Sequence, residues 1–80
     1  MKALIAVKDI ISVSHCTKGW TDYLTIHLSN DIILRNSCYH YEESMRQRDK
    51  CAKIKEAYNK ILEAVKNKIE YVEIDTGEEL

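Results

Sequence analysis

The chain has 80 residues, of which 31% are charged and 45% hydrophobic, with two glycines and no proline. This length fits one domain, because domains usually run from about 50 to 250 residues and no stretch has the composition of a linker. The formal net charge of -1 excludes the strongly basic profile of a protein that coats nucleic acid, and it also excludes an acidic disordered tail.

The first half of the chain, about residues 3–37, predicts strands. Apolar side chains fall on alternate positions, which is the pattern of a half-buried strand. The apolar residues are Ile5, Val7, Ile11 and Val13, and His15 continues the same alternation. Asp9 interrupts the row. The interruption leaves two possibilities open, one bent strand or two short ones.

Residues 23–28 alternate aliphatic with more polar side chains, so this strand has one buried and one wet face. Residues 29–31 are turn formers and predict a hairpin. A three-residue loop pairs Leu28 with Ile32 and brings aliphatic side chains together across the hairpin. A two-residue loop would instead set charged Arg35 against an aliphatic residue, so we favour the longer loop.

The second half predicts one long amphipathic helix over about residues 44–68, then a short strand over 69–74 and a polar tail over 75–80. The apolar residues of the helix recur at spacings of three and four: Cys51, Ile54, Ala57, Tyr58, Ile61, Leu62 and Val65. Such a stripe packs a helix on a sheet. We expect Ile54, Tyr58, Ile61 and Val65 to face Leu24, Ile26 and Leu34 across the core. The predicted class is therefore α+β, with a small antiparallel sheet of three to four strands packed by the helix.

The three cysteines, Cys16, Cys38 and Cys51, are an odd number in a short chain. This favours reduced thiols over a disulfide framework, and so a cytoplasmic location. The apolar run of residues 3–7 is too short for a signal peptide or a membrane span, so we expect neither export nor membrane association.

Soft-metal ligands occur as His15, Cys16, Cys38, His40 and Cys51. Structural zinc sites usually bring ligands in close pairs such as CxxC, and none of these residues has that spacing, so we expect no metal site. Cys16 and His15 are neighbours on a strand and point to opposite faces, which disfavours a catalytic pair. No glycine-rich phosphate loop is present in the sequence. We expect a protein that is not an enzyme, with no catalytic residues and no cofactor.

The candidate ligand-binding residues are aromatic and basic: Trp20, Tyr39, His40, Tyr41, Arg46 and Arg48. Residues 46–55 carry five positive side chains against one acid. Guanidinium groups bind phosphate oxygens and aromatic faces stack on bases, so this set suits a nucleotide. The alternative is a structural role, in which the basic residues form a solvated helix face and Trp20 covers the edge of the core.

Two short segments, Asp9-Ile10-Ile11 and Tyr23 to Leu28, resemble the opening strands of LytTR-type DNA-binding domains. The resemblance covers under half of the chain, and the low net charge is poor for phosphate neutralisation on DNA. We transfer no family function from it.

The sequence predicts a small binding protein that sequesters or blocks a ligand. Self-association into a homodimer or larger assembly is expected, because a core of this size seldom supplies more than about 3 to 5 kcal/mol. Ten isoleucines against five alanines hint at an AT-rich genome, and many small proteins from such genomes are phage products. The most specific form of the functional prediction is therefore a phage-type counter-defence protein that traps a nucleotide signal. The alternatives are a protein inhibitor of a host protein and a small transcriptional regulator.

Overall fold

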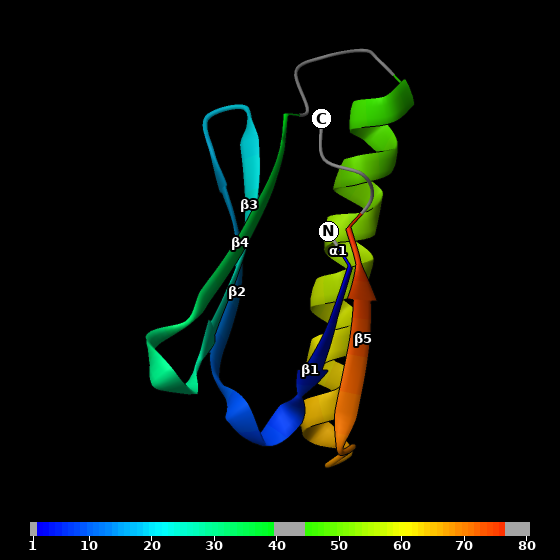
Figure 1. The fold of residues 1–80 in the computed structure, drawn as a ribbon. Coiled ribbons are helices and arrows are strands. Elements are labelled where there is room, and N and C mark those ends of the chain that lie inside the picture. Colours follow the sequence, from blue (N-terminus) through cyan, green and yellow to red (C-terminus); the bar gives the residue numbers. More distant parts are fainter. Residues whose placement is uncertain (1, 40–44, 77–80) are drawn as a thin grey trace.

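The structure is a computed structural model that describes residues 2–39 and 45–76, with the side chains of its long helix from Arg48 onward. Along the chain the elements are β1 (Lys2–Ala6), the short helical turn η1 (Val7–Asp9), β2 (Ile10–Lys18), β3 (Thr21–Leu28), a second turn η2 (Ser29–Asp31), β4 (Ile33–Tyr39), α1 (Met45–Lys66) and β5 (Tyr71–Asp75). The predicted α+β class is confirmed. All strand pairs are antiparallel, and α1 packs against them (Figure 1).

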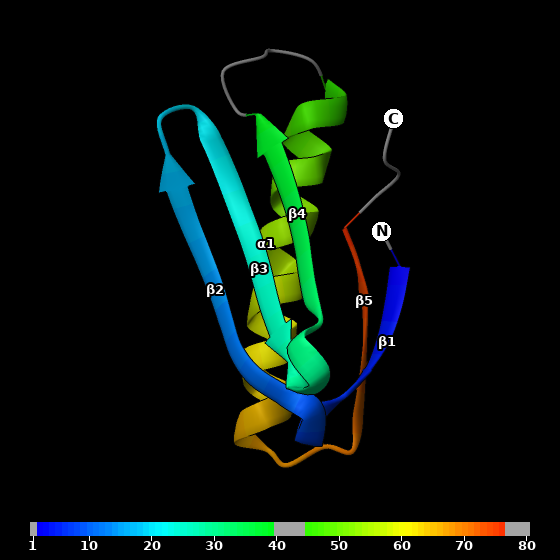
Figure 2. The same ribbon diagram turned by 60° about the vertical axis from the view of Figure 1, so that its left-hand side comes forward.

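The strands form two sheets. β2, β3 and β4 lie side by side in that order, whereas β1 pairs only with β5 (Figure 2). The N-terminal stretch is therefore two strands rather than one bent strand, and η1, which contains Asp9, redirects the chain between them. The backbone N–H of Val7 donates to the carbonyl of Glu70 at 3.0 Å and ties this turn to the segment before β5.

Ile11 corrects the predicted strand pattern. It was expected on the buried side, but 62% of it is exposed. The pairing of β2 with β3 shifts register between Ile10 and Ser12, and such a bulge moves the following side chains to the other face of the sheet. Ile10 packs against the core in its place.

The three-residue hairpin loop is confirmed. Ile26 lies opposite Leu34, and the N–H of Leu28 donates to the carbonyl of Ile32 at 2.8 Å. Asn30 takes a φ of 71°, a left-handed conformation that asparagine tolerates better than most residues.

The buried face of α1 differs from the predicted stripe on one side. Ile54 and Ile61 are buried as expected, but Val65 is 46% exposed, and Ala64 is buried instead. The helix covers two sheets and packs chiefly against β5 and β4. The small side chain of Ala64 fits this close packing, and the face is rotated away from Val65.

The helix ends two residues before the predicted limit. Lys68 has a φ of 54°, its N–H donates to the carbonyl of Val65, and the N–H of Ile69 donates to the carbonyl of Ala64. These are the two hydrogen bonds of a Schellman motif, which terminates a helix. The last strand reaches Asp75, and Thr76 is fully buried, so the polar tail does not begin at residue 75 as predicted; residues 77–80 lie outside the described part.

The cysteines correct a further prediction. Cys38 and Cys51 form a disulfide, with their Cα atoms 5.4 Å apart, while Cys16 is free and exposed. The interpretation of three reduced thiols failed because it used only the count. Cys51 belongs to the apolar stripe of the helix, and the packing of α1 on β4 brings it against Cys38. The disulfide ties the first turns of the helix to the end of the strand.

Candidate functional site

The outer face of the β2–β3–β4 sheet, opposite α1, carries the aromatic end of the candidate site. Trp20 lies in the turn between β2 and β3 and is 57% exposed. Tyr39 is the last residue of β4, lies directly opposite Thr21, and is 41% exposed. Since Trp20 precedes Thr21, the two predicted aromatic residues lie at the same end of the sheet. We call this region the aromatic end.

The basic part of the predicted site is only partly described. Arg48 is exposed in the first turns of α1. The Cys38–Cys51 disulfide holds these turns beside the end of β4, and Figure 1 shows both at the same end of the molecule as the β2–β3 turn. The predicted residues His40 and Tyr41 and the side chain of Arg46 lie outside the described residues.

Three further outer-face residues were not selected from the sequence: Lys18, Tyr23 and Arg35. Lys18 pairs with Thr21 in the row that also contains Tyr39. Tyr23 and Arg35 lie on the same outer face, further along the sheet. Strand parity already placed Tyr23 on the wet face, but only the register of β4 shows that Arg35 shares it.

The inner face of the same sheet carries a different group of side chains, which we call the inner cluster. Its members come from four elements: His15 of β2, Asp22 of β3, Cys38 of β4 and Cys51 of α1. The strand register places Asp22 between Thr17 and Cys38. The thiol-derived sulfurs and a carboxylate oxygen of Asp22 all lie within 4.8 Å of one another.

Two contacts hold the polar side of the inner cluster. The hydroxyl of Thr17 donates to Oδ1 of Asp22 at 2.5 Å, and Nε2 of His15 lies 4.0 Å from Oδ2 of the same carboxylate. Cys38 Sγ is 3.9 Å from that Oδ2, but a disulfide sulfur has no proton to donate, so this is a contact rather than a hydrogen bond. The His15 ring also packs on Tyr58, with ring centroids 5.5 Å apart.

The nitrogen of His15 that faces Asp22 is a polar atom without a hydrogen bond. Nε2 is buried, and no hydrogen-bond partner reaches it within the described structure. A buried polar atom in this state costs free energy unless a ligand, ion or water satisfies it. Sequence reasoning had grouped the histidines and cysteines but had omitted Asp22, since no local spacing links it to them.

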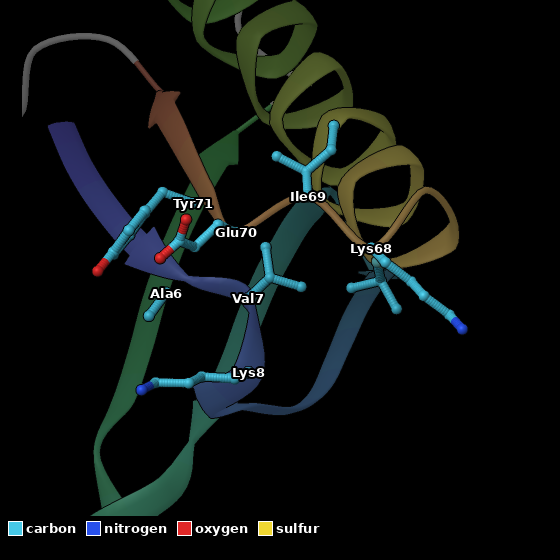
Figure 3. Close-up of a pocket in the computed structure, with 8 residues that line it drawn as sticks. Ala6, Val7, Lys8, Lys68, Ile69, Glu70 and Tyr71 are labelled. Atoms are coloured by element: carbon cyan, nitrogen blue, oxygen red, sulfur yellow. The ribbon is translucent and has the colours of Figure 1, made fainter.

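A separate hollow of about 370 Å³ lies at the other end of the molecule (Figure 3). It is lined by residues around η1 and by the segment from the end of α1 to β5: Ala6, Val7, Lys8, Val65, Lys68, Ile69, Glu70 and Tyr71. Ile69 and Tyr71 are about half exposed beside it, as is Val65. Val65, which was predicted to lie in the core, lines this hollow instead.

Comparisons with protein-family models, with curated proteins and with solved structures found no match. Within the described ranges, α1 is too polar to cross a membrane, and no other helix there is long enough to do so.

Proposed function

We propose that this chain is a small non-enzymatic protein that binds a nucleotide at its aromatic end and acts by sequestering it. The single observation that carries the proposal is that Trp20 and Tyr39, both substantially exposed, lie at the same end of the sheet, because Tyr39 pairs with Thr21, which follows Trp20. An exposed aromatic face stacks on a base, worth about 1 to 3 kcal/mol per base. Two such side chains at one end of a sheet suit a base or a dinucleotide.

A positive side chain on the same face as the aromatic end suits the phosphates. Lys18 shares a row with Tyr39 on the outer face, and Arg48 lies exposed in the first turns of α1, on the other side of the sheet. A guanidinium group can bind two phosphate oxygens at once, and an ammonium group adds a point charge. The weak overall charge of the chain favours a small ligand over a long nucleic acid, whose affinity depends on many phosphate contacts.

Trp20 is the only tryptophan in the chain, so its fluorescence reports on the aromatic end directly. We expect titration with ATP or with a cyclic dinucleotide to quench this fluorescence, and calorimetry to give the same affinity. Tyr39→Ala should weaken binding by about 1 to 3 kcal/mol. Ile33→Ala is the control, because Ile33 is an exposed apolar residue at the opposite end of β4.

The charge contribution is tested in the same way. Arg48→Ala should weaken binding by about 1.5 to 3 kcal/mol, the range for hydrogen bonds to charged groups. Lys60→Ala is its control, because Lys60 is an exposed cation on the same helix about 18 Å further along at 1.5 Å per residue. Silence of the whole nucleotide series would reject the proposed function.

A second candidate function rests on the exposed apolar residues around the hollow. Val65, Ile69 and Tyr71 expose roughly half of their surface at one place, and exposed apolar patches commonly mark protein contacts. We propose that a second copy of this chain covers them. Sedimentation should then show a dimer at micromolar concentration, and Val65→Asp should shift it to the monomer. A monomeric wild-type protein that captures one host protein would instead favour the inhibitor function.

A further inference from the structure

We propose that the inner cluster is a zinc site that forms when the Cys38–Cys51 disulfide is reduced. The site is independent of the proposed nucleotide function, since it lies between the sheet and α1 while the aromatic end lies on the outer face. The sequence disfavoured a metal because no CxxC pair is present. That spacing rule applies to ligands from one turn, and here the four ligands come from four elements.

The donor set matches the chemistry of zinc. Reduction would give two thiolates, and the cluster adds an imidazole and a carboxylate, all of which are established zinc ligands. Thiolate sulfur selects zinc over magnesium or calcium, which prefer oxygen. Two sulfurs, one nitrogen and one oxygen complete a four-coordinate shell, as expected for a structural rather than a catalytic site.

The Asp22 carboxylate and the two sulfurs need only small movements to bind one ion. In a tetrahedral zinc site the bonds of about 2.0 to 2.3 Å place neighbouring ligand atoms about 3.3 to 3.8 Å apart. The sulfur and carboxylate atoms already lie within 4.8 Å of one another, and Nε2 of His15 is 4.0 Å from Oδ2 of Asp22. Once the bond between the sulfurs is opened, a shift of about an ångström brings the carboxylate oxygen and the sulfurs to this distance, and His15 would reach the ion from the side of Asp22.

Two neighbours prepare the ligands for a metal. Thr17 donates to one oxygen of Asp22 and leaves Oδ2 directed toward the sulfurs and His15. Tyr58 packs on the ring of His15. Outer contacts of this kind orient metal ligands and raise affinity. A zinc ion at this position would also satisfy the buried Nε2, which otherwise has no hydrogen bond among the described residues.

The reduction step balances with a thiol reductant. One thiolate of a dithiol attacks a sulfur of the Cys38–Cys51 bond and releases the other sulfur as a thiolate; its second thiolate then attacks the resulting mixed disulfide and releases the remaining protein sulfur. The protein gains two electrons and two protons as two thiols, and the reductant leaves as its own disulfide. Zinc binding then releases the two thiol protons.

The test uses the full chain reduced with a phosphine, which does not supply thiol ligands, and cobalt(II) as the spectroscopic probe. We expect one cobalt per chain, with the charge-transfer and visible absorption of a tetrahedral thiolate complex, and displacement by zinc. The oxidised protein should show no such spectrum. Binding of equal strength to the oxidised protein, or no binding after reduction, would overturn the proposal.

Variants separate the four ligands from incidental thiol binding. Cys51→Ser should abolish the thiolate spectrum. Asp22→Asn, which keeps the side-chain shape, should weaken zinc affinity by more than about 100-fold, because even outer contacts to a metal ligand cost 10- to 100-fold. Cys16→Ser is the matched control and should leave binding unchanged, because Cys16 lies exposed on the outer face.

If reduction of the disulfide partly unfolds the protein, circular dichroism still tests the proposal. Zinc should then restore the wild-type helix signal and raise its thermal midpoint, since a ligand that binds only the folded state stabilises it. It should do neither for Cys51→Ser. Retention of full zinc affinity by both Asp22→Asn and His15→Ala would overturn the four-ligand site.

Discussion

Ile61 provides the most direct test of which helix face is buried. It is fully buried on α1, whereas Val65, one turn later and predicted to share its environment, is 46% exposed. Ile61→Ala deletes three carbon atoms, worth about 2.4 kcal/mol at about 0.8 kcal/mol per buried methylene. A residual cavity that the neighbouring side chains only partly fill raises the expected loss to about 3 to 4 kcal/mol.

The same truncation at Val65 should cost much less. Val65→Ala removes a side chain that is half in water already, so we expect a loss below about 1 kcal/mol. Both variants are measured by urea denaturation followed by far-ultraviolet circular dichroism, with the m-value checked for a common two-state transition. Because a domain of this size holds only about 3 to 5 kcal/mol in total, Ile61→Val, expected to lose about 0.5 to 1.5 kcal/mol, keeps the measurement in range. A larger loss for Val65→Ala than for Ile61→Ala would refute the assigned face.

Two further predictions concern the covalent and backbone restraints. The Cys38–Cys51 bond closes a loop with a sequence separation of 13, and closing such a loop stabilises the fold by about 3 kcal/mol because it lowers the entropy of the unfolded chain. Cys38→Ser should therefore lower the urea midpoint in the absence of added metal. An unchanged midpoint would show that the bond does not form in solution. Cys16→Ser, with a free and exposed thiol, should match the wild type. Asn30→Val should lower the free energy of unfolding by about 1 to 3 kcal/mol, because a β-branched residue is strained at a φ of 71°. Asn30→Gly should be tolerated, because glycine adopts this conformation readily. Equal stability of the two variants would contradict the left-handed turn.

Local patterns in the sequence were sufficient for the fold class and for the elements with a regular period. The hairpin register followed from the side-chain alternation and the turn formers at residues 29–31, because a slip of one residue would turn the aliphatic side chains to solvent. The existence of the long helix followed from its stripe, and Ile54 and Ile61 were correctly assigned to the core. Both features depend on short-range periodicity, which the sequence displays directly.

Local patterns failed where a distant partner sets the environment. Val65 belongs to the stripe, but β5 packs beside α1 and rotates the buried face toward Ala64. Ile11 alternates correctly with its neighbours, but a bulge in the pairing with β3 turns it outward. The sequence around Val65 does not indicate the second sheet, and the sequence around Ile11 does not indicate the bulge, so the pattern of these residues could not predict their exposure.

For the two candidate sites as well, the sequence showed which side chains are present, and the fold decided which of them lie together. The aromatic and basic residues Trp20, Tyr39 and Arg48 were selected from the sequence because their side-chain chemistry is visible one residue at a time. That Trp20 and Tyr39 lie at the same end of the sheet was decided by the pairing of β3 with β4. For the inner cluster, the sequence displayed His15, Cys38 and Cys51 as possible metal ligands but gave no reason to add Asp22. Only the packing of a helix against three strands brings the carboxylate, the imidazole and the two sulfurs close to one another. Side-chain chemistry is a property of each residue, whereas proximity is a property of the fold.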